Sequence, residues 1–287
     1  MKWDFGINGK LVRFTTKDGM LLHGFITPAS KKKVLIYIPG FYSNFYDDFR
    51  FQHLAKELSS IGWSFFSANN RGHDAITDIP ISDGKYVEGG TAYEKFENCL
   101  DDIKGAIDFV SRNGYSEIVL IGLSTGCQKI IYYQSRTGDK RVKGIILLGA
   151  VDDYNSFRNQ LGKSYGKIIK TLKKMKKDEL LPSKMVPGYL MTAGRFLSDA
   201  DLKNPEARIL NYDSEMEDFT KIKCPMIIAF GSKDQYLTKP VDEHFRILRN
   251  RTNSSDFRTL VINNTNHNFR GKEKELAKEI GRWLKRQ

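Results

Sequence analysis

The stretch from Glu117 to Gln128, E-I-V-L-I-G-L-S-T-G-C-Q, constrains the fold more than any other part of the sequence. An apolar run rich in β-branched residues predicts a buried strand, and it ends abruptly at Gly122-x-Ser124-x-Gly126. The two glycines remove Cβ atoms that would clash in a tight strand-to-helix turn, so Ser124 can adopt a strained backbone conformation with its Oγ exposed. The motif therefore predicts a nucleophilic serine at the start of a helix.

A serine nucleophile needs a histidine to accept its proton and a carboxylate to orient that histidine. Of the five histidines, His267 has the most suitable position, in a polar turn between the strand-like residues 258–262 and the amphipathic helix predicted at 272–285. Three others lie within predicted strands or helices, where a half-buried or surface imidazole is the simpler interpretation: His23, His53 and His244.

Asp234 is the best candidate for the carboxylate. It lies in the loop that follows the buried strand predicted at 225–231, and such a loop reaches the same sheet edge as Ser124. Asp152 and Asp153 follow the neighbouring strand-like segment 144–150 and are the competing acids. The favoured chain order is Ser124, Asp234, His267.

This order and these motifs resemble the α/β-hydrolase superfamily over most of the chain. The segment Val34-Leu-Ile-Tyr-Ile-Pro-Gly-Phe41 is similar to the third strand of that family and its oxyanion loop, with Pro39 where histidine is more usual. The resemblance implies that the backbone N–H groups of Phe41 and Thr125 form the oxyanion hole. It implies no metal and no organic cofactor.

A second element of the resemblance is Asn69-Asn-Arg-Gly-His-Asp74, which is similar to the family's D-x-R-G-x-G turn. His73 and Asp74 could act as a metal pair or a base. The resemblance favours a structural role instead, in which Arg71 and Gly72 brace the loop. Asn69 and Asp74 depart from the family pattern, which puts the geometry of the turn in doubt.

A narrower resemblance lies in the elbow Ser-Thr-Gly-Cys-Gln at 124–128. It is similar to the elbow of a fungal-type group of hydrolases that includes esterases opening hydroxamate siderophores. The segment Arg195-Phe-Leu-Ser198 also resembles that group.

Strand-like and helix-like segments alternate along the chain, which predicts a mostly parallel sheet flanked by helices, an α/β fold. An early hairpin is expected at 11–16 and 20–27. Further strands are expected at 34–39, 63–68, 117–122, 143–149, 225–231 and 257–262, and helices near 49–61, 93–112, 125–136, 240–250 and 272–285. We expect residues 1–151 and 224–287 to form the hydrolase core and residues 152–223 a helical cap.

The predicted cap is strongly basic. Residues 158–184 hold nine Lys or Arg and two acids, so seven of the net twelve positive charges lie there. An apolar stripe recurs at helical spacing in the same stretch, and we expect it to pack over the active site: Leu161, Ile168, Leu172 and Met175. The lysines are most simply a solvated face, although attraction of anionic substrates or a membrane surface is the alternative.

Composition excludes several other classes. Three cysteines, odd in number and far apart, argue against a disulfide framework or a zinc site: Cys99, Cys127 and Cys224. The first six residues lack the apolar region of a signal peptide, and no run approaches the ~20 apolar residues that span a bilayer. We therefore expect a cytoplasmic protein with no integral membrane segment. The sequence contains no recognised nucleic-acid-binding motif, so we also expect no nucleic-acid partner. The sequence leaves the oligomeric state open.

These observations favour hydrolysis of a small-molecule carboxylic ester through an acyl-enzyme. Thioesterase, peptidase and acyltransferase activities use the same groups and remain alternatives, because fold does not fix function. A non-catalytic ligand-binding protein with the same fold is the more distant alternative.

Overall fold

The structure of this protein, a computed structural model, describes residues 6–287. Its strands are β1 (Lys10–Thr15), β2 (Leu21–Thr27), β3 (Lys33–Ile38), β4 (Ser64–Ala68), β5 (Thr77–Pro80), β6 (Tyr86–Gly89), β7 (Glu117–Leu123), β8 (Val142–Leu148), β9 (Met226–Gly231) and β10 (Phe257–Ile262). Its α-helices are α1 (Phe51–Ser60), α2 (Cys99–Arg112), α3 (Thr125–Thr137), α4 (Asp153–Leu161), α5 (Tyr165–Leu172), α6 (Ala193–Asp199), α7 (Pro205–Ile209), α8 (Glu217–Thr220), α9 (Val241–Arg251) and α10 (Glu273–Leu284).

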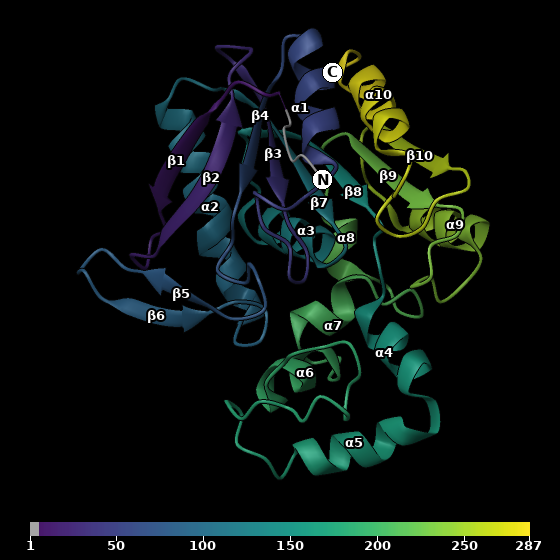
Figure 1. The fold of residues 1–287 in the computed structure, drawn as a ribbon. Coiled ribbons are helices and arrows are strands. Elements are labelled where there is room, and N and C mark those ends of the chain that lie inside the picture. The colour runs from purple at the N-terminus through teal and green to yellow at the C-terminus, as the bar shows by residue number, and fades with distance from the viewer. Residues whose placement is uncertain (1–5) are drawn as a thin grey trace.

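An eight-stranded sheet in the order β1-β2-β4-β3-β7-β8-β9-β10 forms the centre of the molecule (Figure 1). From β4 to β10 in this order, each strand pairs in parallel with the next. Strand β2 pairs antiparallel with both β1 and β4. The predicted α/β class, with a mostly parallel sheet, is confirmed. Because parallel strands end at one edge, the loops that follow β3, β7, β8, β9 and β10 open on the same side.

Both faces of the sheet are covered by apolar side chains, which explains why the central strands are continuous apolar runs. Along β7, Ile118 and Leu120 belong to one hydrophobic cluster, whereas Val119 and Ile121 belong to the other. Helices α2, α3 and α9 pack in the first cluster and helices α1 and α10 in the second. Helix α3 is thereby fixed at its N-terminus by β7 and along its length by the core.

Most predicted core elements agree with the structure to within one or two residues, with two differences. The helix expected from residue 93 starts only at Cys99, after a 3-10 turn at Phe96–Asn98, because Lys95 is extended. The hairpin of β5 and β6 was not predicted. Its strands have four residues each and only Ile79 and Gly89 are buried, so they carry little apolar pattern.

The segment between β8 and β9 carries α4 to α8, and Figure 1 shows α4 to α7 gathered beyond one end of the sheet. This segment has its own hydrophobic cluster, which includes Phe157, Leu172, Met191 and Phe196. The predicted apolar stripe packs in or against this cluster. It therefore stabilises the segment from within.

The described chain contains no helix long and apolar enough to cross a membrane. The expectation of no signal peptide rests on the first six residues, and residues 1–5 lie outside the described residues. The three cysteines are free, and Cys99 and Cys127 are buried.

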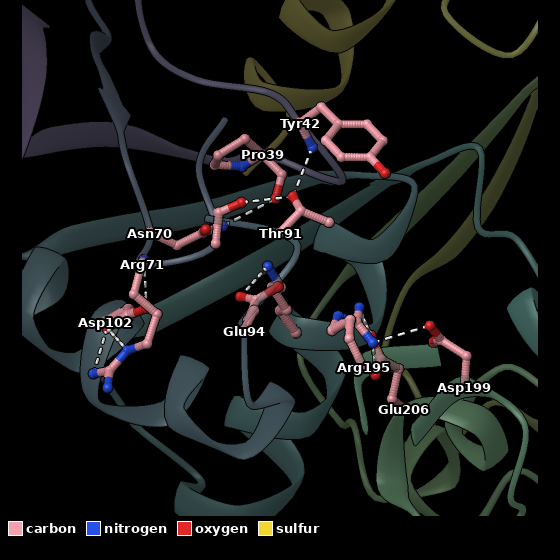
Figure 2. Close-up of polar contacts among 12 residues, drawn as sticks. Pro39, Tyr42, Asn70, Arg71, Thr91, Glu94, Asp102, Arg195, Asp199 and Glu206 are labelled. Atoms are coloured by element: carbon pink, nitrogen blue, oxygen red, sulfur yellow. Dashed lines mark hydrogen bonds and ion pairs between the residues drawn. The ribbon is translucent and has the colours of Figure 1, made fainter. Parts of the chain in front are cut away.

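The turn after β4 is braced by ion pairs, as the sequence suggested for Arg71. The Arg71 guanidinium donates to Asp102 Oδ1 on α2, and its backbone N–H donates to Asp102 Oδ2 (Figure 2). The guanidinium also donates to both carboxylate oxygens of Asp18. His73 Nδ1 lies 2.7 Å from Asp74 Oδ2, and that carboxylate also accepts from Asn44 and Tyr46. His73 and Asp74 therefore hold loops together.

The burial of Asp102 makes it the critical partner of Arg71. Its side chain is 1% exposed, whereas that of Asp18 is 39% exposed. We expect Asp102→Asn to lower the free energy of unfolding by about 3–5 kcal/mol, because it leaves a buried charge short of its partner. The matched control Asp18→Asn should cost less than about 1 kcal/mol. Urea denaturation of both variants measures this difference, and equal losses would contradict the assignment.

Candidate active site

Ser124 lies between the end of β7 and the start of α3 with φ +55°, a conformation that non-glycine residues seldom adopt. Close backbone packing enforces this turn. A Cβ on Gly126 would lie 2.3 Å from the Ile38 carbonyl oxygen, and a Cβ on Gly122 would lie 2.5 Å from the backbone of Gly126. Both glycines of the motif are therefore required by contacts with the chain itself, as the sequence suggested.

His267 and Asp234 are brought together by the loops after β10 and β9. The distance from His267 Nδ1 to Asp234 Oδ2 is 2.8 Å, and both residues are buried. The second oxygen of Asp234 accepts from the backbone N–H of Tyr236 at 3.0 Å. The carboxylate is thus held on one side by its own loop and faces the imidazole on the other.

Several contacts that the sequence did not reveal hold the imidazole. The Tyr236 ring packs edge-on against it with centroids 4.9 Å apart, and Gln235 Oε1 accepts from the His267 backbone N–H. A Cβ on Gly149 would lie 2.7 Å from His267 Cε1, so only glycine leaves room for the ring there. The sole sequence signal for Gly149 is its position at the end of β8.

The loop that carries His267 is also fixed from the other side of the site. Arg50 Nη1 donates to the backbone oxygen of Asn268 at 3.0 Å, and Asp48 neutralises this buried guanidinium. The Tyr37 hydroxyl donates to the same Asp48 carboxylate. A polar chain therefore runs from β3 to the histidine loop.

Ser124 and His267 line the same cavity, whose volume is about 390 Å³. Within residues 6–287, His267 Nε2 makes no hydrogen bond, so the ring nitrogen opposite Asp234 is unpaired. Hydrogen bonds between a serine nucleophile and its base are often long without substrate and tighten in the complex. The cavity thus holds a strained serine and an imidazole whose free nitrogen has no competing partner.

The Phe41 and Thr125 amides also border this site. A Cβ on Gly40 would lie 3.1 Å from Ser124 Cβ and 3.5 Å from the nitrogen of Thr125, so the two loops meet at the elbow. Neither the Phe41 nor the Thr125 N–H donates to another residue of the described chain. Two free amides beside a serine can stabilise a negatively charged oxygen.

The loop of Phe41 is positioned by the turns around it (Figure 2). Asn70 Nδ2 donates to the Pro39 carbonyl at 3.2 Å, and the Tyr42 N–H donates to Thr91 Oγ1 at 2.9 Å. Thr91 in turn donates to the Gly72 carbonyl. The family-like turn after β4 therefore supports the loop after β3.

Neither competing acid contacts His267. Asp152 caps α4 by accepting from the Asn155 N–H, and it also accepts from the Tyr212 N–H. Asp153 accepts from Gln128 Nε2 at 2.6 Å and lines the cavity. Burial raises the pKa of both carboxyls.

The remaining nucleophiles and bases near the elbow have other surroundings. Cys127 is fully buried, and burial raises the pKa of its thiol, which disfavours the reactive thiolate. His244 is also buried, contrary to the surface or half-buried position expected, and packs against Tyr212 and Phe230. Across residues 6–287 there is no cluster of three or more His, Cys, Asp or Glu that could hold a metal.

A larger cavity of about 980 Å³ lies between residues 93–97 and helices α5 and α6. Its lining includes none of the residues predicted to be catalytic. The chemistry suggested by the sequence therefore belongs to the smaller cavity.

Comparison with solved structures shows that the chain has an α/β-hydrolase fold. Est1E from Butyrivibrio proteoclasticus, solved with ferulic acid bound, matches with a TM-score of 0.65 and 15% identity over 96% of this chain and 98% of its own. The Pyrococcus furiosus esterase Pf2001 matches with a TM-score of 0.65 and 17% identity, over 100% of this chain and 95% of its own. Alpha/beta hydrolase domain-containing protein 10 from mouse matches with a TM-score of 0.66 and 15% identity, over 96% of this chain and 99% of its own.

Within this fold class, the chain belongs to the family described as "Protein of unknown function (DUF1749)", whose model matches residues 7–285. No curated protein sequence matches the chain significantly. The narrower resemblance to siderophore esterases stays a prediction.

Gly149 offers a test of how the imidazole is held. We expect Gly149→Ala to destabilise the protein by about 1–3 kcal/mol more than Gly138→Ala. Both glycines have positive φ, at +55° and +54°, but a Cβ on Gly138 would meet no atom within 4 Å. Gly138→Ala therefore pays only the backbone strain. Urea denaturation gives the difference, and the NMR signals of His267 should shift in Gly149→Ala alone; identical behaviour of the two variants would contradict the contact.

Proposed function

We propose that this protein is a serine hydrolase that cleaves a carboxylic ester through a covalent acyl-enzyme. In this proposal Ser124 Oγ attacks the carbonyl carbon while His267 Nε2 accepts its proton. Asp234 keeps the proton of the neutral ring on Nδ1 and stabilises the imidazolium that forms. His267 then protonates the leaving alcohol, and a water activated by the same ring releases the acid.

The observation that carries the proposal is the hydrogen bond between His267 Nδ1 and Asp234 Oδ2, beside a cavity that the strained Ser124 also lines. A carboxylate on Nδ1 leaves Nε2 as the basic nitrogen. The unpaired Nε2 supports this role, because a purely structural histidine in a buried site normally has both nitrogens satisfied.

The backbone amides of Phe41 and Thr125 are proposed to bind the oxyanion. Such donors act on charge that develops only as the tetrahedral intermediate forms, and losing one typically costs about 3 kcal/mol. Their lack of other acceptors supports the assignment. The start of α3 adds a favourable dipole at the same point.

Residues 152–223 are proposed to act as a cap over the site. Phe157 and Tyr189 of this segment line the cavity together with Ser124. The core, residues 1–151 and 224–287, would then supply the chemistry and the cap the substrate contacts. The lysines of the proposed cap are mainly exposed, which supports the solvated face expected from the sequence.

An ester is favoured over an amide because an alcohol leaves more readily than an amine. Two of the solved structures similar in fold, Pf2001 from Pyrococcus furiosus and a domain of a Rhodothermus marinus protein, are described as esterases. Thioester and peptide cleavage, or transfer to an acceptor other than water, would use the same groups.

Covalent labelling tests the nucleophile. We expect a fluorophosphonate probe to add one equivalent to the wild-type chain and none to Ser124→Ala, because only an activated serine attacks phosphorus readily. Intact-mass spectrometry and peptide mapping give the stoichiometry and the residue. Folded wild-type protein that resists labelling would favour a non-catalytic ligand-binding role instead.

Substitution of the three acids tests the orienting carboxylate. We expect Asp234→Asn to lower kcat for p-nitrophenyl butyrate by about 10³–10⁴-fold, because the wrong tautomer of His267 is then favoured. Asp152→Asn and Asp153→Asn should lower kcat far less, since neither carboxyl contacts the imidazole. The reverse ranking would move the orienting role to the loop after β8.

A further inference from the structure

A buried cluster of charged side chains lies where α3 meets the β8–β9 segment, and Figure 2 labels Glu94, Arg195, Asp199 and Glu206 among them. Its two cations are Lys129 and Arg195, and each side chain is fully buried. The acids are Glu94, Asp153, Asp199 and Glu206, each with 6% or less of its surface exposed. Four buried carboxyl groups therefore share two positive charges.

The ion pairs assign the two cations to three of the acids. Lys129 Nζ lies 2.6 Å from Glu94 Oε1. Arg195 Nη1 lies 2.9 Å from Asp199 Oδ2 and 2.6 Å from Glu206 Oε2, and its other terminal nitrogen binds the second oxygen of Glu206. The fourth acid, Asp153, has no ion pair within the described residues.

Asp153 is consequently the member of the cluster that lacks a cation. Its side chain instead accepts a hydrogen bond from the neutral amide of Gln128, at 2.6 Å. Burial and the nearby charge of Glu206 raise its pKa well above the usual range, and Arg195 only partly opposes this. Ionisation without a cation nearby would leave an uncompensated buried charge, which favours the protonated form of this carboxyl.

The surroundings of Asp153 are those of the catalytic cavity. Asp153 lines the same cavity of about 390 Å³ as Ser124 and His267. Five aromatic residues also line it: Phe41, Tyr42, Phe157, Tyr189 and Tyr236. An unpaired carboxyl among aromatic rings is a favourable environment for an ammonium group, which gains from both the charge and the π-faces.

We propose that Asp153 selects substrates that carry a protonated amine, so that the ester cleaved at Ser124 is an amino ester. This inference rests on the proposed function of the site. When the ammonium group binds, Asp153 releases its proton to solvent and the carboxylate pairs with the cation. The lysines of 158–184 are exposed, so water and salt weaken their repulsion of a cationic substrate.

The test compares matched esters that differ by one group. The 4-methylumbelliferyl esters of 3-aminopropanoic, 4-aminobutanoic and 6-aminohexanoic acids are paired with those of butanoic, pentanoic and heptanoic acids, in which a methyl replaces the ammonium. Each kcat/KM is divided by the rate constant for hydroxide-catalysed hydrolysis of the same ester. We expect wild type to prefer the ammonium member by at least about tenfold at one chain length or more, a factor that corresponds to about 1.4 kcal/mol.

Two variants identify the residue responsible. Asp153→Asn should reduce this preference at least about tenfold, whereas Asp152→Asn, whose carboxylate caps α4, should keep it. Loss of preference in Asp152→Asn together with Asp153→Asn would show a general effect of the loop and overturn the assignment. Retention of the preference in Asp153→Asn would overturn it equally.

Wild type alone already decides the substrate class if Asp153→Asn fails to fold. If the two members of every pair have the same normalised kcat/KM, protons alone neutralise the excess negative charge of the cluster. The proposal would then be wrong. The neutral esters and the fluorophosphonate separate this from failure of the proposed function. If they react at Ser124 and the ammonium preference is absent, only the selection by Asp153 fails; if nothing reacts, the hydrolase proposal fails as well.

Discussion

The close approach of two backbones, at the end of β3 and the start of α3, is the constraint on which the rest of the site depends. Gly126 packs directly beneath the Ile38 carbonyl, and Gly40 packs against the elbow at Ser124. These contacts leave no space for a Cβ, and they hold Ser124 at a positive φ. Strain of this kind persists only where the surrounding structure over-determines it. Here the core strands β3, β7 and β8 supply that support, since the Ser124 N–H donates to the Leu148 carbonyl.

The elbow and its two distant partners were predictable because each depends on a local pattern. An apolar strand ended by glycines fixes Ser124, and the loops after the last two strands carry Asp234 and His267. Parallel strands then bring these loops to one edge without further information. The structure pairs Asp234 with His267, as the sequence favoured, and gives Asp152 a capping role.

Other features could not be predicted because they arise from contacts between distant segments. Gly149 carries no motif, yet the imidazole occupies the space where its side chain would be. Helix α2 starts late because Lys95 is extended, and its neighbour Glu94 pairs with Lys129. The cavity is lined by Phe157 and Tyr189, whereas the apolar stripe predicted to cover it packs in the segment's own cluster. Periodicity reveals that a helix has an apolar face, but not what that face meets.

The buried charges link the core of the protein to the segment between β8 and β9. Glu94 occupies the space beside Gly72, where a Cβ would lie 2.3 Å from its Cδ, and pairs with Lys129 on the helix that follows Ser124. Arg195 of α6 lies over the ring of Phe41, with 4.8 Å from its Cζ to the ring centroid. The loop proposed to bind the oxyanion is thus in contact with the proposed cap.

The most direct measurement of the central claim is the site of acylation during turnover. Wild-type protein is mixed with p-nitrophenyl acetate, quenched with acid within milliseconds, digested and mapped by mass spectrometry. The account predicts an acetyl group on Ser124. If Asp234→Asn or His267→Ala slows deacylation more than acylation, the amount of acetylated Ser124 should rise in that variant. Turnover of the ester with the acetyl group on another residue, or with no acetylated Ser124 at any quench time in wild type or variants, would contradict it.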